Sequence, residues 1–238
     1  MIIKNNIPNK GVYSFKAWTL GDEKRTIMGM EETDSLYKKI EYIFANLIGE
    51  EESLNYEEKL YILLNMKSKI SDNNINISYT CENCKQHSEA NIKLDESLHL
   101  TEEVRLNMDM GDITFDIRYA ENLEDGIVGI PKEHIEDLLN DMHIDKYDTL
   151  EDTFYRLNPQ FEMKGIGKCL ICGHEVIYTP PKSDMINMIM TLNLMTYYDT
   201  LVSMKQHGFS ISEIEGLMPF ELELITSTII RKMKNSQG

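Results

Sequence analysis

Helical spacing of apolar residues dominates the first third of the chain. Apolar side chains recur over 36–48 at the spacing of one helix face. Asn55 can cap a second helix, because Glu58 stands three residues later as the reciprocal member of a capping box. Alternation over 11–18 predicts a short strand, and the rest of 1–33 reads as irregular or strand-like. These patterns predict that the N-terminal region contains a short strand and is otherwise mainly helical.

Alternating apolar and polar positions then predict β-hairpins in the middle of the chain. Two pairs of such segments each enclose a C-x₂-C turn. The first pair is 75–80 and 89–94, and the second pair is 161–168 and 174–179. Between the two pairs, the pattern predicts a further hairpin over 103–119, a short helix after Pro131 and a helix over 149–157. The middle of the chain therefore reads as a β-subdomain with an insertion.

The last third of the chain is predicted to be helical. Apolar side chains occupy nearly every face of a helix expected from Ser183 to about Gln206, and such a helix must be buried all round. Two shorter helices begin after Ser210 and at Pro219. Because they can cover only one side, either the zinc-binding β-subdomain or another protein must cover the other, and we favour another protein at this Met-rich end. The residues predicted to bind that partner are Met188, Leu192, Met195, Tyr198, Phe220 and Leu224.

These elements predict an α+β fold in three parts. Residues 1–72 form the N-terminal strand and helical region, and 73–180 form a split, zinc-ribbon-like β-subdomain with an insertion over 95–158. Residues 181–238 form a C-terminal α-helical subdomain.

All four cysteines of the chain lie in the two C-x₂-C turns. A tight turn of this kind lets two thiolates from one hairpin converge on one ion, and two hairpins supply a tetrahedral four-sulfur site. The predicted zinc ligands are Cys81, Cys84, Cys169 and Cys172. Because 84 residues separate the two turns, the metal would clasp distant parts of the chain. A site filled by four thiolates is closed to substrate, which favours a structural role.

Other interpretations of the cysteines stay open. They are redox-active C-x₂-C pairs, four reduced thiols without a ligand, and one disulfide within each turn. Thioredoxin-like chemistry places its C-x₂-C before a helix N-terminus, whereas strand patterns follow both turns here. His87 and His174 lie close enough in sequence to replace a cysteine ligand, although we expect both to be exposed. Iron suits a four-thiolate site as zinc does.

Composition narrows the range of functions. The formal net charge of −16 disfavours binding to a nucleic-acid backbone and suits basic protein partners. No stretch approaches ~18 consecutive apolar residues, so no membrane span is expected. The N-terminal residues lack the apolar core of a signal peptide, which predicts a cytosolic protein.

No group of residues forms a recognisable catalytic motif, so we predict that the chain is not an enzyme. Gly165 and Gly167 give only G-x-G before a cysteine turn, which indicates close backbone packing and not a phosphate-binding loop. Four aspartates share a spacing that could suit a hard cation but better fits a solvated acidic helix face; they are Asp137, Asp141, Asp145 and Asp148.

The order of several stretches resembles the baseplate hub assembly proteins of T-even-type contractile-tailed bacteriophages. These stretches are NYEEKLYILLNMKSK over 55–69, CENC over 81–84, IKL over 92–94, FDIRY over 115–119, and YY, HGFS and MPFELEL within 197–224. The second cysteine turn is not part of the resemblance, so the metal prediction rests on the cysteines alone.

The resemblance implies a non-enzymatic baseplate hub component or hub assembly chaperone. Expected partners are other hub or tape-measure proteins, without nucleic acid or membrane, and homo-oligomerisation stays open. The expected location is the host cytoplasm during assembly, with the virion tail baseplate as a further location. The alternative function is a zinc-ribbon module that binds nucleic acid or associates with transcription, and a thiol oxidoreductase is a third.

Overall fold

The protein was analysed as a computed structural model that describes residues 1–30, 35–120, 122–190 and 193–235. It has a mixed α+β fold with small antiparallel sheets. The chain divides into two compact units. Unit 1 comprises Met1–His99 and Met163–Gly238, and unit 2 comprises Leu100–Glu162. The expected division at 72 and 180 stays a prediction.

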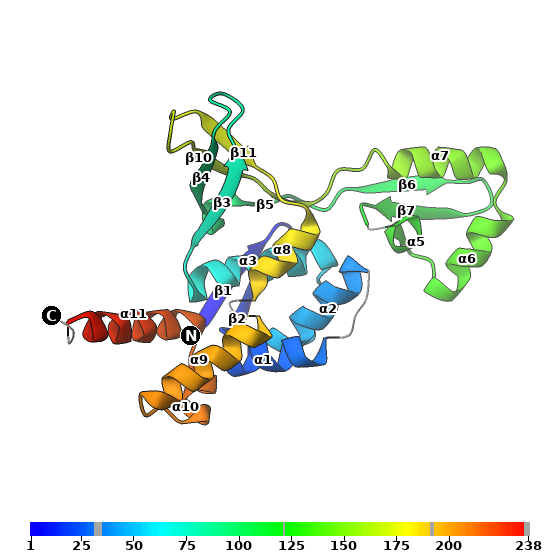
Figure 1. Cartoon of the computed structure of the whole chain (residues 1–238). Helices are drawn as coiled ribbons and strands as arrows, with labels where there is room; N and C mark the ends of the chain where they lie inside the picture. The colour runs from blue at the N-terminus through cyan, green and yellow to red at the C-terminus, as the bar shows by residue number, and fades with distance from the viewer. Residues whose placement is uncertain (31–34, 121, 191–192, 236–238) are drawn as a thin grey trace. The chain divides into compact units, whose positions relative to one another are not determined.

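Helix α3 (Tyr56–Ile70) is the most buried element in the N-terminal part of unit 1. Asn55 and Glu58 form the predicted capping box at its start. The helix packs against strand β1 and helices α2 and α8 (Figure 1, where α3 is cyan and α8 is yellow). The other elements of this part are β1 (Ile2–Ile7), β2 (Gly11–Lys16), α1 (Leu20–Gly29) and α2 (Leu36–Leu47).

Helix α1 corrects the interpretation of 1–33 as irregular or strand-like. Thr19 caps this helix, because its hydroxyl accepts a hydrogen bond from the Asp22 amide and the Asp22 carboxylate accepts one from the Thr19 amide. Glu23 on the same helix accepts a hydrogen bond from the buried Trp18 indole at 2.9 Å. These polar contacts set the start of α1 without a strong apolar stripe.

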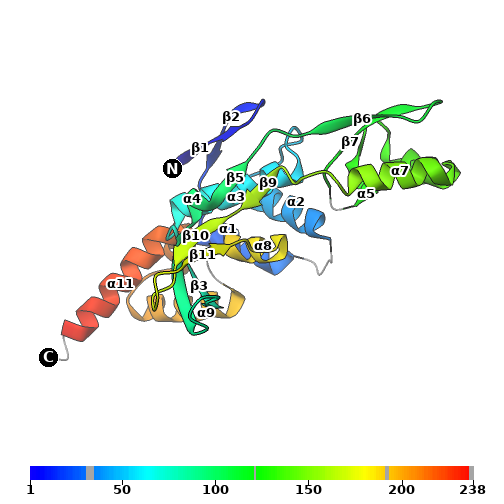
Figure 2. The same ribbon diagram turned by 90° about the horizontal axis from the view of Figure 1, so that it is seen from above.

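The two cysteine turns join the strands of two antiparallel hairpins in unit 1. The first hairpin is β3 (Asn74–Thr80) with β4 (His87–Lys93), and the second is β10 (Gly165–Lys168) with β11 (Glu175–Tyr178). Strand β10 packs against β4, and both views show the hairpins side by side (Figures 1 and 2). Short elements follow the first hairpin and precede the second; they are α4 (Leu94–Ser97), β5 (Leu98–Leu100) and β9 (Phe161–Met163).

Glycine makes the close packing of the two hairpins possible. A Cβ atom added at Gly167 would lie 2.9 Å from the Ala90 Cβ, and one at Gly165 would collide with the Ile92 side chain. This placement agrees with the prediction that the G-x-G segment serves backbone packing.

Unit 2 folds around its own apolar core. A three-stranded sheet packs against helices through Phe115, Ile117, Ile127, Ile135 and Leu150. Its helices α6 and α7 match the two helices predicted there, although α7 begins five residues before Thr149. The elements are β6 (Arg105–Asp109), β7 (Thr114–Arg118), α5 (Leu123–Gly126), β8 (Ile127–Val128), α6 (Lys132–Asp141) and α7 (Ile144–Phe154).

The C-terminal part of unit 1 is helical, but the expected long helix over 183–206 is divided. Helix α8 (Lys182–Ile189) ends before Met190, which has extended backbone angles, and Asn193 caps α9 (Leu194–Gln206). The division lets α8 pack against α3 while α9 contacts α1. Helices α10 (Ile211–Gly216) and α11 (Pro219–Asn235) begin where predicted.

Helices α9 to α11 share a core with α1. Leu20, Met204, Ile214 and Leu222 are buried together. In addition, the Glu215 carboxylate accepts hydrogen bonds from Lys24 at 2.6 Å and from the Tyr197 hydroxyl at 3.0 Å. Within the described ranges, no helix combines the length and apolar character that a bilayer span requires.

Candidate metal centre

The two cysteine turns have the same backbone structure. In the first turn, the Cys81 amide donates to the Gln86 carbonyl and the Lys85 amide donates to the Cys81 carbonyl. In the second, the Cys169 amide donates to the His174 carbonyl and the Gly173 amide donates to the Cys169 carbonyl. The residue after each second cysteine has a positive φ, 58° at Lys85 and 72° at Gly173. Each turn therefore presents its two thiols in the same way.

The four thiols converge at one point, as predicted. All four sulfur atoms lie within 4.8 Å of one another. The Cys81 and Cys172 sulfurs are 3.7 Å apart, and those of Cys84 and Cys169 are 3.9 Å apart. Four sulfurs that each lie about 2.3 Å from one zinc ion in a tetrahedron are about 3.8 Å apart. The described sulfur positions thus fit a tetrahedral four-thiolate site.

Side chains around the cluster hold the two turns against each other. The Asn83 amide from the first turn donates to the Cys172 sulfur of the second at 3.6 Å. The Ser88 hydroxyl of β4 lies 3.5 Å from the Cys169 sulfur. Cys81 and Cys169 are buried and Cys172 is exposed, so the cluster lies at the edge of the paired hairpins.

Hydrogen bonds and neighbouring thiols separate the pKa values of the cysteines. The Ser88 hydroxyl and the backbone amides of the second turn lower the pKa of Cys169 to about 5. The pKa of Cys172 is also lowered, mainly by the His174 amide. At Cys84 the Gln86 amide lowers the pKa, but burial and the three other thiols outweigh it and raise the value to about 11. The cluster therefore holds both thiols and thiolates at neutral pH.

Binding of zinc is expected to release protons and to strengthen as the pH rises. Metal ligands must be thiolates, and Cys84, with a pKa of about 11, carries a proton at pH 7 that zinc would displace. Cys169, with a pKa of about 5, is already ionised and releases none. Each proton released makes the affinity rise about tenfold per pH unit. Competition with a chromophoric chelator between about pH 6 and 8 measures this slope, and an affinity independent of pH would contradict it.

The described sulfurs do not form disulfides. All four cysteines are free, and the 3.7 Å between the Cys81 and Cys172 sulfurs far exceeds the roughly 2.05 Å of an S–S bond. Strands β4 and β11 follow the two turns, whereas thioredoxin-like sites lie at a helix N-terminus. His87 and His174 are exposed and do not belong to the cluster. The arrangement suits a closed structural metal site.

The residues predicted to bind a partner occupy different environments. Met195 and Leu224 are 73% and 63% exposed, and Tyr198 is 44% exposed. Met188 and Phe220 are half-buried, and Leu192 lies outside the described residues. The aspartates considered for a hard cation are exposed on α6 and α7; these are Asp137, Asp141, Asp145 and Asp148.

Comparison with known proteins identifies the family of the chain. The family model described as "T4 bacteriophage base plate protein" matches residues 1–128, which include the first cysteine turn and are more than half of the sequence. The comparisons with curated proteins and with solved structures give no match. The chain therefore belongs to the T4 bacteriophage base plate protein family.

Proposed function

We propose that the chain is a non-enzymatic component or assembly chaperone of the baseplate hub, acting in the host cytoplasm during tail assembly. Its four cysteines would bind one zinc ion, and its C-terminal helices would bind another hub or tape-measure protein. The observation that carries the proposal is the convergence of four thiols from distant segments in a chain of a baseplate family.

The zinc would make the paired hairpins a split zinc ribbon. Two C-x₂-C turns with matching backbone hydrogen bonds are the usual halves of such a ribbon. The ion would join β3–β4 to β10–β11, which lie on either side of unit 2 in the sequence. Metal binding would then stabilise the scaffold and supply no chemistry of its own.

The proposed partner surface lies on α9 and α11. Met195, Tyr198 and Leu224 are exposed there, whereas Met204 and Leu222 on the same two helices are buried in the shared core with α1. The buried residues fix the helices to unit 1, and the exposed ones remain available. Exposed methionine and aromatic side chains suit adaptable protein interfaces.

Replacement of both Met195 and Leu224 by Glu is expected to weaken capture of a co-expressed hub or tape-measure protein by about tenfold or more. Both side chains are exposed, so the core should remain intact. Pull-down from co-expressing cells, together with metal analysis of the purified chain, tests the two parts of the proposal separately. Truncation after Pro180 is less informative, because it would remove buried partners of Leu20.

The matched control is Val12→Glu on β2, an apolar side chain that is 63% exposed. It should leave capture unchanged. Equal capture by the Met195/Leu224 variant and the wild-type chain would refute docking through these helices. Iron in place of zinc in the metal analysis would correct the identity of the ion.

A further inference from the structure

Negative charge is concentrated in unit 2. Residues 100–162 contain 17 acidic and 5 basic side chains, a net charge of −12 out of −16 for the whole chain. The remainder of the chain, almost three times longer, therefore carries only −4. So many negative charges on a small unit produce a negative electrostatic potential, which attracts positively charged partners and speeds their association.

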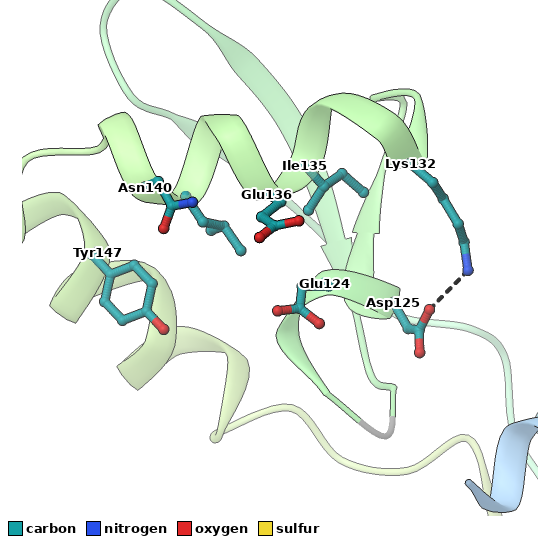
Figure 3. A pocket seen from close by; sticks show the side chains of 8 residues that line it. Glu124, Asp125, Lys132, Ile135, Glu136, Asn140 and Tyr147 are labelled. Atoms are coloured by element: carbon teal, nitrogen blue, oxygen red, sulfur yellow. Dashed lines mark hydrogen bonds and ion pairs between the residues drawn. The ribbon is translucent and has the colours of Figure 1, made fainter.

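A groove of about 650 Å³ opens between the helices of this unit. Its apolar floor is formed by Ile135, which is buried, and Leu139, which is half-buried. Figure 3 shows the carboxylates of Glu124 and Glu136 pointing into the same space, with Tyr147 at its far side. The remaining lining residues are Asp125, Lys132 and Asn140.

One of the acidic groups in the groove is already paired. The Lys132 ammonium lies 2.9 Å from the Asp125 carboxylate. Glu124 and Glu136 are exposed and add two negative charges to the apolar floor. The groove therefore offers an apolar base and a net negative rim, which is the complement of a long cationic side chain.

The spacing of these groups does not favour a metal ion. Among the described residues, the four cysteines form the one group of three or more acidic, histidine or cysteine side chains close enough to hold an ion. The groove also has a volume within the range of organic ligand sites, roughly 300–1,000 Å³. An extended organic cation fits this space better than a bare divalent ion.

We propose that this groove binds an arginine side chain from a basic segment of a partner protein. The aliphatic stem of the arginine would lie on Ile135 and Leu139, and its guanidinium would lie between Glu124 and Glu136. Tyr147 offers an aromatic ring against which a planar guanidinium can stack. This surface lies outside both the cysteine cluster and the C-terminal helices, so it goes beyond the proposed function.

The test uses the full chain and a fluorescein-labelled peptide of eight arginines as the probe. Glu124→Gln combined with Glu136→Gln is expected to weaken binding, measured by fluorescence anisotropy, by roughly tenfold. The matched control is Asp137→Asn with Asp141→Asn, which removes two charges from exposed positions of α6 outside the groove. This control should change the affinity by less than about threefold, because neither aspartate lines the groove and an exposed charge without direct contact contributes little.

The outcomes distinguish specific binding in the groove from nonspecific electrostatic attraction to unit 2. Equal weakening by both double variants would overturn the proposal, because it would show that only net charge matters. Displacement of the peptide by micromolar Ca²⁺ or Mg²⁺, beyond the effect of equal ionic strength, would also overturn it in favour of a cation site. Stronger binding of the arginine peptide than of a matched lysine peptide, lost on Tyr147→Leu, would support it. The measurement does not depend on zinc or on capture by α9 and α11.

Discussion

Cys81→Ser is expected to abolish tight zinc binding and to unfold the paired hairpins of unit 1. Cys81 is fully buried, and its sulfur lies 3.7 Å from that of Cys172. A serine hydroxyl does not replace a thiolate ligand, and the binding energy of a structural zinc is folding energy. We expect a loss of about 3–5 kcal/mol or more in unfolding free energy. Zinc analysis should fall from one ion per chain to nearly none, and protease cleavage should appear within 73–99.

The control for this prediction is His174→Ala in the second cysteine turn. His174 is exposed and its side chain lies outside the cluster, so the variant should keep both zinc and stability. Removal of zinc from the wild-type chain with a chelator should reproduce the Cys81→Ser result. Cooperative unfolding at the wild-type temperature together with loss of zinc would show that the hairpins hold together without the ion.

The cysteine cluster could be predicted because its chemistry is local. A C-x₂-C turn between two alternating segments presents two thiols whatever the rest of the fold does. The sequence does not specify how the two hairpins meet. That contact depends on Gly165 and Gly167 lying against Ile92 and Ala90, which are more than seventy residues away in the chain.

Helix α1 and the break between α8 and α9 were not predicted, for different reasons. Helix α1 has a weak apolar pattern, and its signal is the Thr19-x-x-Asp22 capping box, which periodicity alone does not detect. The break between α8 and α9 has the opposite cause, because apolar residues on every face suggest one continuous helix. Here Asn193 caps a new helix, and tertiary contacts with α3 and α1 decide the direction of each piece.

The hydrophobic pattern also did not predict that charged residues of α3 are buried. Apolar side chains of this helix such as Leu60 and Leu63 are buried, but so are Glu57, Glu58 and Lys59. Glu58 accepts a hydrogen bond from Lys10 at 2.8 Å, and Glu57 contacts Lys182. Buried charges need partners, and these partners come from β1–β2 and α8, which are distant in sequence. The burial of these charges can therefore be recognised only in the folded unit, where their partners lie beside them.

The acidic groove, like the buried charges, could not be predicted from the sequence pattern. The sequence places many carboxylates in the inserted segment, and a solvated helix face explains Asp137 and Asp141. Glu124 and Glu136 differ because α5 and α6 bring them to one apolar floor. Helical spacing describes each element separately, so it cannot find a space that three elements enclose.

Gly165→Val is expected to separate the two hairpins and to weaken zinc binding. A Cβ at Gly165 would collide with Ile92 and lie 3.1 Å from the Ser97 hydroxyl, and the two branches of valine need more room still. Overpacking of this kind costs about 1–3 kcal/mol, or more where backbone must move. Because Cys169 follows four residues later, displacement of β10 also moves its sulfur away from Cys84, which now lies 3.9 Å away. Thermal unfolding and a chelator competition measure the two effects.

The neighbouring substitution Ile166→Val provides the control. Ile166 is 61% exposed and points away from β4, so the change should leave stability and zinc affinity within error of the wild-type chain. A second test uses the contact between Gly167 and Ala90. Gly167→Ala should destabilise the chain, and Ala90→Gly in the same chain should recover part of the loss, because it removes the methyl group that the new one meets at 2.9 Å. If the stability losses of Gly167→Ala and Ala90→Gly simply add, the two residues do not contact each other as described. That result, or wild-type stability and zinc affinity in the Gly165→Val chain, would show that β4 and β10 do not set the geometry of the four thiols.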